Sequence, residues 1–126
     1  MNRTARSVFL FAALLGMAAC SADVGGSWLG SWAGDNSGGG SMTLQLSQSG
    51  TSVYGEAVVS GQACLPTGTV SGSMDGDKLG ATIQSGSVTM TLTGTVSDDD
   101  KTVGGTYAFK GGQCDSQTGT WSVSKQ

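Results

Sequence analysis

The chain has 126 residues, with six lysines and arginines against nine aspartates and glutamates, and it contains no histidine. This length allows a single domain. The lack of histidine excludes a Ser–His or Cys–His nucleophile and a histidine metal site, and the acidic balance argues against a nucleic-acid partner.

The N-terminal segment has the form of a secretory signal. Arg3 and Arg6 precede an uncharged apolar run from Val8 to Ala19, and this run is followed at once by Cys20. The run is too short for an ordinary membrane-spanning helix, whereas a positive start, a short apolar stretch and small residues are typical of a signal peptide. The sequence therefore predicts that residues 1–19 form a cleaved signal helix.

The residues around the cleavage point carry a family resemblance. Met17-Ala18-Ala19-Cys20 resembles the lipobox of bacterial lipoproteins. The resemblance implies that Cys20 takes a diacylglycerol, that residues 20–26 form a lipidated N-terminus and tether, and that the protein is anchored in the cell envelope by its lipid. Ser21 after the cysteine implies the outer membrane in a Gram-negative host, with the protein facing the periplasm or the cell surface.

Two cysteines remain once Cys20 is assigned to the lipid. Cys64 and Cys114 are an even pair in a compartment that is oxidising, and the sequence predicts a disulfide between them. Cleavage also removes both arginines, which leaves the mature chain more acidic.

The rest of the chain shows the period-two alternation of β-strands, clearest where Met90 and Leu92 alternate with Thr89, Thr91 and Thr93. Glycine, serine, aspartate and asparagine fill the intervals, as turns require. The pattern predicts eight strands, at Ser27–Ala33, Ser41–Ser49, Ser52–Ser60, Thr67–Met74, Lys78–Gln84, Ser87–Ser97, Thr102–Lys110 and Thr118–Ser124.

Evenly spaced strands with short links favour an all-β fold over residues 27–126, an antiparallel up-and-down barrel of eight strands, with an orthogonal β-sandwich as the alternative. In a barrel, the loops that carry Cys64 and Cys114 fall at the same end, as a disulfide requires. The outward residues are mainly serine and threonine, unlike the apolar exterior of a membrane-spanning barrel. The expected inward residues include Met42, Leu44, Leu46, Val53, Val70, Met74, Leu79, Ile83, Met90, Leu92, Tyr107 and Phe109.

The tryptophans carry a second resemblance. Gly26-Ser27-Trp28 resembles the first-strand motif of calycins and lipocalins, and Gly119-Thr120-Trp121 is similar to avidin-like barrels. The calycin resemblance implies a barrel that carries a small apolar ligand. Trp28, Trp32 and Trp121 would then either seal the seam of the barrel or line a ligand pocket.

The remaining site hypotheses concern the loops. Asp35 and Asp115 fall at the same end and could bind a partner or, remotely, act as a catalytic carboxylate pair, and Tyr107 is a further binding candidate. Asp98-Asp99-Asp100 lacks the spacing of a calcium loop and indicates a solvated turn. We expect no metal and no cofactor.

The sequence thus predicts a non-catalytic, lipid-anchored envelope protein that binds or inhibits a protein partner, or binds a glycan, through its disulfide-tied loops. The alternative is a carrier of a small apolar ligand, and a hydrolase is a remote third. Because consecutive strands alternate in direction, the first strand begins at the end of the barrel opposite the disulfide-tied loops. The anchor is therefore expected at the end with the tight turns, near Asp75-Gly76-Asp77 and Asp98-Asp99-Asp100. The loops around Asp35, Cys64 and Cys114 would face away from the membrane.

Overall fold

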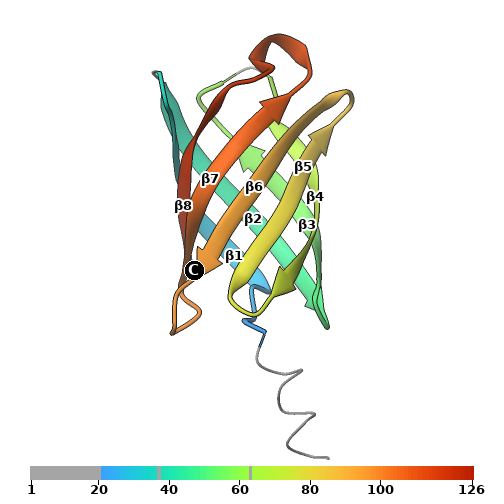
Figure 1. Cartoon of the computed structure of the whole chain (residues 1–126), viewed down its shortest axis with the longest axis vertical. Coiled ribbons are helices and arrows are strands. Elements are labelled where there is room, and N and C mark those ends of the chain that lie inside the picture. The colour runs from blue at the N-terminus through green and yellow to red at the C-terminus, as the bar shows by residue number, and fades with distance from the viewer. Residues whose placement is uncertain (1–20, 37, 63) are drawn as a thin grey trace, which may run out of the picture.

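The computed structural model describes residues 21–36, 38–62 and 64–126, which form a closed barrel of eight antiparallel strands (Figure 1). Each strand pairs with its neighbours in sequence, and the last strand pairs with the first. The predicted up-and-down barrel is therefore confirmed over the sandwich, and the signal segment and Cys20 lie outside the described residues. The elements are β1 Gly26–Gly34, β2 Gly39–Ser49, β3 Ser52–Val59, β4 Thr67–Asp75, β5 Lys78–Ser85, β6 Val88–Val96, β7 Thr102–Lys110, the short 3-10 helix η1 Gly112–Cys114 and β8 Thr118–Lys125.

The alternation of the sequence decides which side chains face inward. On β6, Met90 and Leu92 are buried, whereas Thr91 and Thr93 are exposed on the outer wall. Closure of the barrel pairs Trp32 on β1 directly with Trp121 on β8. Because a shift of one residue would turn every side chain to the wrong face, the apolar positions fix the register.

The interior is filled by one continuous apolar cluster. All twelve of the expected inward residues are at most 8% exposed, and this part of the prediction is confirmed. Further members come from the same strands or from the two barrel ends: Val24, Ala57, Val59, Leu65, Ala81, Val96, Val103, Cys114 and Val123.

Two of the tryptophans close the interior toward opposite ends. The indole N–H of Trp28 donates to the carbonyl of Val24 at 2.9 Å, and that of Trp32 donates to the carbonyl of Ser60 at 2.7 Å. The ammonium of Lys125 lies 5.7 Å from the centroid of the Trp28 ring, within the range of a cation–π contact. Each indole N–H thus has a partner, as a buried donor needs.

The third tryptophan depends on an inward glycine. Trp121 lies against Gly94 on β6, where a Cβ atom would come within 2.8 Å of the Trp121 ring. Its indole N–H donates to the carbonyl of Thr106 at 3.0 Å. A side chain at position 94 would therefore displace the ring, so this glycine provides the space in which Trp121 packs.

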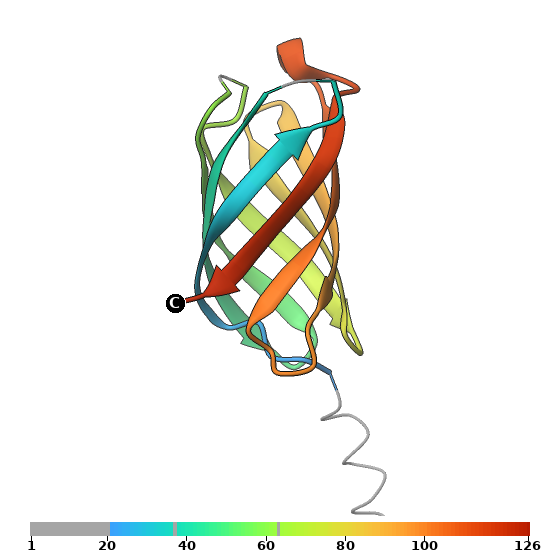
Figure 2. The same cartoon turned by 90° about the vertical axis from the view of Figure 1, so that its left-hand side faces the viewer.

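The N-terminal segment that leads into β1 is packed against the barrel. The amide of Ala22 donates to the carbonyl of Gly76 at 2.9 Å, and the amide of Val24 donates to the Gln48 side chain at 2.8 Å. The Val24 side chain is fully buried, and its carbonyl is the acceptor for the Trp28 indole. Figure 2 shows this blue segment passing under the lower rim of the barrel before β1 begins. Residues 22–25, expected to be part of a tether, therefore close the lower end, which we call the base.

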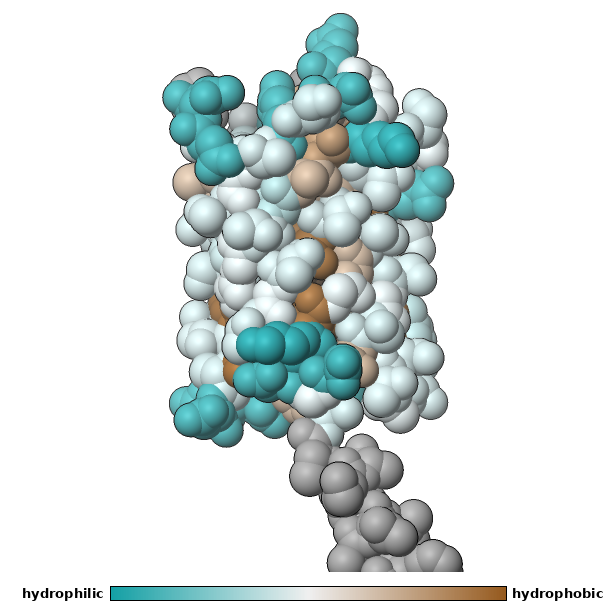
Figure 3. Space-filling model, in the orientation of Figure 1, coloured by the Kyte–Doolittle hydropathy of each residue, from teal (hydrophilic) through white to brown (hydrophobic). Residues whose placement is uncertain are grey.

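The outer wall is polar but carries little charge. Figure 3 shows pale residues of intermediate hydropathy over most of the visible wall, with strongly hydrophilic residues gathered toward the two ends. The large apolar side chains that are exposed, Leu29, Tyr54 and Val58, belong to β1 and β3. In the part of the chain that the structure describes, no helix has the length and apolarity that a membrane crossing needs.

Candidate functional site

The end of the barrel opposite the base holds the loops that follow β1, β3, β5 and β7 (Figure 1). The predicted disulfide is present there, between Cys64 after β3 and Cys114 after β7, with their Cα atoms 6.1 Å apart. Since four strands separate these two loops in the closed order, the bridge runs across the mouth of the barrel. We call this the strapped end.

An apolar side chain beside the disulfide is buried in the mouth of the barrel, at the end that Trp32 also closes. Leu65, next to Cys64, is fully buried and belongs to the core cluster. The barrel is thus stoppered at both ends, by Val24 below and by Leu65 above. Both residues lie outside the strands, so their burial follows from where the loops fold and not from the alternating pattern.

The loop that carries Leu65 is organised by Gln62. Its side-chain oxygen accepts from the amides of Cys64 and Leu65 at 2.6 and 2.9 Å. Its side-chain nitrogen donates to the carbonyls of Val59 and Leu65 at 3.1 and 2.9 Å. One amide side chain therefore satisfies four backbone groups that have no strand partner. Sequence reasoning did not single out Gln62.

The opposite loop is shaped by Asp115. Its carboxylate accepts from the amide of Gly111 at 2.8 Å, across the turn that contains η1. Gly111 and Gly112 have φ of 90° and 66°, and Ser116 has φ of 72°, which is left-handed backbone that favours glycine. Asp115 thus has a clear structural role in this loop.

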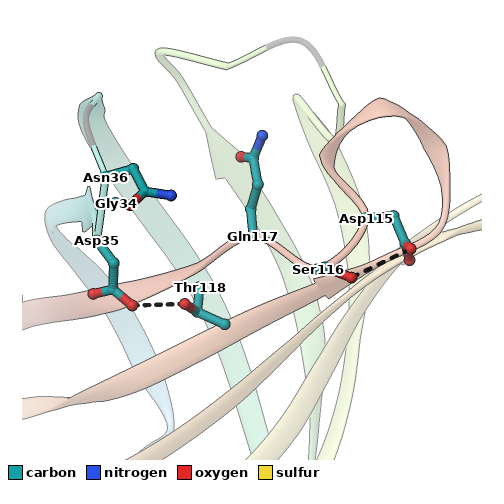
Figure 4. Close-up of a pocket in the computed structure, with 7 residues that line it drawn as sticks. All are labelled: Gly34, Asp35, Asn36, Asp115, Ser116, Gln117 and Thr118. Carbon is teal, nitrogen blue, oxygen red and sulfur yellow. Dashed lines mark hydrogen bonds between the residues drawn. The ribbon is translucent and has the colours of Figure 1, made fainter.

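Two adjoining cavities open beside the strapped end, and together we call them the polar groove. The first, of about 340 Å³, lies between the loops after β1 and β7 and is lined by Gly34, Asp35, Asn36, Asp115, Ser116, Gln117 and Thr118 (Figure 4). The second, of about 310 Å³, continues along the outer wall of β6, β7 and β8 and is lined by Asp35, Thr91, Thr93, Thr106, Tyr107, Ala108, Thr118, Gly119 and Thr120. Cavities of this size are in the range used for small ligands.

Asp35 and Thr118 line both cavities and are joined twice. The amide of Asp35 donates to the carbonyl of Thr118 at 2.9 Å, and the Thr118 hydroxyl donates to the Asp35 carboxylate at 2.6 Å. Figure 4 shows Asp35 and Asp115 at opposite sides of the first cavity, with Gln117 between them. The structure thus brings the two predicted aspartates to one cavity, each already bonded within its own part of the wall.

The Tyr107 side chain packs inside the barrel, behind the part of β7 and β8 that the groove follows. The residue is 4% exposed, and its ring packs edge-on against Trp32 and Phe109 at centroid distances of 6.0 and 5.7 Å. The ring crosses its strand partner Gly119, where a Cβ atom would come 2.5 Å from the hydroxyl oxygen. In residues 21–36, 38–62 and 64–126 this hydroxyl has no hydrogen-bond partner.

The surroundings of Tyr107 shift its titration. Burial raises the pKa of the Tyr107 hydroxyl above its ordinary value, and the negative charge of Asp35 raises this pKa further. The hydroxyl is therefore neutral near neutral pH and available to donate a hydrogen bond.

The three tryptophans are not part of this groove. Trp28, Trp32 and Trp121 are at most 7% exposed, and none of them lines either cavity. They fill the barrel and bond to its backbone, as the seam-sealing alternative expects. The apolar interior and the polar cavities are therefore separate features of the molecule.

The acidic turn at the base is held by its own hydrogen bonds. The hydroxyl of Ser97 donates to the Asp99 carboxylate at 2.7 Å, and the amide of Lys101 donates to it at 3.1 Å. These two bonds lower the pKa of Asp99 below its ordinary value. Among the residues that the structure describes, no group of three or more histidine, cysteine, aspartate or glutamate side chains could hold a metal ion.

Comparison of the chain with known protein families, with curated proteins and with solved structures finds no match. The site is therefore interpreted from its own geometry. It combines two carboxylates, side-chain amides and a row of threonine hydroxyls, without a lysine in the lining of either cavity.

Proposed function

We propose that this protein is a lipid-anchored protein of the bacterial cell envelope that binds a partner through its strapped end. The observation that carries the proposal is that the two ends of the barrel differ. The chain enters at the base through Ala22 and Val24, and the disulfide and the polar groove lie at the other end. An anchor at Cys20 would leave that end free in the aqueous phase.

The contents of the barrel favour binding at the surface over transport of a ligand inside. Trp28, Met42, Ile83 and Met90 are fully buried members of one apolar cluster, and none of the four lines either described cavity. An eight-stranded barrel has just enough interior for side chains or for one small ligand, and here side chains occupy it. The arrangement therefore supports a binding module more than a carrier.

The geometry around the aspartates favours a non-catalytic role. Asp35 accepts a hydrogen bond from Thr118, and Asp115 accepts one from the amide of Gly111. A general base must reach the proton that it removes, and a catalytic pair needs carboxyl groups with different environments. Both carboxylates here are exposed and serve the turns in which they lie.

The anchor is tested by mass spectrometry of the protein extracted with detergent from its host. The wild-type chain should begin at Cys20 and carry acyl chains, and Cys20→Ser should carry none. Ser41→Ala, on the outer wall, is the matched control and should be acylated like the wild type. A wild-type protein without acyl chains would refute the anchor.

The orientation of binding is tested by photocrosslinking in intact cells. A diazirine amino acid at Asn36 or Gln117 should capture a partner, because both positions line the polar groove. The same probe at Asp99 on the base or at Tyr54 on the far wall should capture much less. Equal capture from all four positions, or none from Asn36 and Gln117, would refute binding through the strapped end.

A further inference from the structure

We propose that the Cys64–Cys114 disulfide is a redox-sensitive clasp, which holds the loop between β7 and β8 closed and releases it when the bridge is reduced. We call this loop, residues 111–117, the clasped loop, and the structure describes all of it. The inference concerns the regulation of the strapped end and therefore rests on the proposed function. Its basis is the way in which the clasped loop is attached to the barrel.

Of the residues in the clasped loop, all of them described, one has a buried side chain. Cys114 is 6% exposed and belongs to the core cluster, whereas the other residues between 112 and 117 are exposed. The sulfur of Cys114 is bonded to Cys64 of the facing loop. Segments with few buried apolar contacts open locally at a lower free energy than the whole fold. The bridge is therefore the main attachment of this loop across the mouth of the barrel.

The hydrogen bonds of the clasped loop stay within it or go to the strand below. The amide of Gly111 donates to the Asp115 carboxylate at 2.8 Å, and the amide of Gln117 donates to the carbonyl of Cys114 at 2.9 Å. The amide of Ser116 donates to the carbonyl of Phe109 on β7 at 3.0 Å. Between described residues, no hydrogen bond joins this loop to the loops after β1, β3 or β5. A shift of its tip, residues 112–115, would leave the pairing of β7 with β8 intact.

The two ends of the tip have the backbone of a hinge. Gly111 and Gly112 have positive φ at one end, and Ser116 has φ of 72° at the other. Glycine adopts such values freely, whereas a residue with a Cβ atom does so at a cost, so the closed loop holds Ser116 in an unfavourable conformation. Hinges are a few residues at the ends of elements that absorb large changes in φ and ψ. Release of the tip would let Ser116 return to a favourable backbone conformation.

The two cysteines differ in access, which sets the order of the exchange. Cys64 is partly exposed, whereas Cys114 is buried. One thiolate of an external dithiol attacks the Cys64 sulfur, the S–S bond breaks, and Cys114 leaves as a thiolate and takes up a proton. The second thiol of the reductant loses its proton and displaces Cys64, which leaves as a thiolate and is protonated in turn. Two electrons and two protons pass to the protein, and the reductant becomes a disulfide.

Opening of the clasp would take apart one side of the first cavity of the polar groove. Asp115, Ser116 and Gln117 form that side. On the other side, Asp35 and Thr118 are joined by two hydrogen bonds that do not involve the clasped loop. The second cavity lies on paired strands and would persist. The redox state of the bridge would therefore change the part of the strapped end that the loops build and leave the wall unchanged.

The first test follows the reduction of the folded wild-type protein by dithiothreitol, at urea concentrations below the unfolding transition. A clasp that opens in the folded state should be reduced at a rate that changes by less than about 2-fold per molar urea. A bridge that is reached only by unfolding of the barrel should be reduced about 5- to 30-fold faster per molar urea, because unfolding exposes the surface on which urea acts. The steep dependence would overturn the clasp.

The second test compares amide order parameters of the oxidised and the reduced protein by NMR. Reduction should lower the values at the tip, residues 113–115, from about 0.85 to below about 0.6. The turn at residues 98–100 is the matched control, since it is also exposed and held by its own hydrogen bonds, and its values should not change. Cys64→Ala/Cys114→Ala should show the mobile tip with and without reductant.

The outcomes separate the clasp from the function on which it rests. A tip that stays rigid after reduction would overturn the clasp, and so would loss of the whole barrel spectrum, because the release would then not be local. Neither test uses a partner. The proposed function is judged separately, by crosslinking from Asn36 and Gln117 in the oxidised protein.

Discussion

Reduction of the Cys64–Cys114 disulfide should destabilise the barrel more than any single surface substitution. The bridge joins two residues that are 50 positions apart, and it spans the mouth of the barrel. In the chain-entropy model a closed loop of this length raises the free energy of unfolding by about 4 kcal/mol. A domain of about 100 residues has a total of only about 5–15 kcal/mol, so the bridge supplies a large share.

The loss can be measured by urea unfolding, with and without a reductant. A urea dependence of about 1–2 kcal/mol per molar, expected for a domain of this size, converts the loss into a midpoint that falls by about 2–4 M. In thermal unfolding, the same loss corresponds to a Tm lower by roughly 15–30 °C. The double variant Cys64→Ala/Cys114→Ala is the control, because its midpoint should not respond to the reductant.

The reasoning fails if reduction moves the wild-type midpoint by less than about 0.5 M. In that case Gln62 and Leu65 would hold the strapped end without the bridge, and the entropy of the open chain would not be the quantity that matters. A fall in the wild type together with an equal response of the double variant would also refute it, because the reductant would then act elsewhere.

Two further substitutions test the packing and the electrostatics of the strapped end. Leu65→Ala should lower the free energy of unfolding, measured with urea, by about 2–5 kcal/mol. Leu29 is 48% exposed on the outer wall, so the control Leu29→Ala should change this free energy by less than about 0.5 kcal/mol. Similar losses in the two variants would contradict the role of Leu65 in closing the barrel. In a Tyr54→Phe background, Tyr107 is the one tyrosine left. In a pH titration, the absorbance of its tyrosinate should appear with a midpoint above the ordinary pKa of 10.0. Asp35→Asn should lower this titration midpoint but not return it fully to the ordinary value, because burial is the larger cause of the shift. Since the pKa of Tyr107 is raised in the folded state, its contribution to the free energy of unfolding should be intact below about pH 10 and should fall as the pH rises through the pKa of the folded protein. An absorbance midpoint that Asp35→Asn leaves unchanged would show that the Asp35 carboxylate does not act on the Tyr107 hydroxyl.

The barrel could be predicted from the sequence because each strand repeats one physical rule. Alternation between residues such as Leu92 and Thr93 assigns the faces, and glycine and aspartate mark the turns, so that strand limits agree to within two residues. Because consecutive strands alternate in direction, the loops after β3 and β7, which carry Cys64 and Cys114, fall at the same end. These features depend on local pattern and on chain order, which a sequence displays directly.

The stoppers and the groove depend on information that no local pattern carries. Val24 and Leu65 are isolated apolar residues in irregular segments, and the signal that could have found Leu65 is its place beside a disulfide cysteine. The groove needs the register between β7 and β8 that sets Tyr107 opposite Gly119. It also needs contact between Asp35 and Thr118, which are 83 positions apart. A sequence identifies such residues as candidates but does not bring them together.

The packing of Ala22 and Val24 beneath the barrel has a consequence for how the molecule would stand on a membrane. With the proposed acyl chains on Cys20, only Ser21 separates the anchor from residues that are hydrogen-bonded to the base. Two residues reach at most about 7 Å, too little for a barrel of this length to turn over or swing far from the bilayer. Nine-residue strands tilted by about 40° give a height of roughly 23 Å. The short link would act as a fixed spacer, holding the polar groove at one height and limiting encounters to partners that reach into that layer.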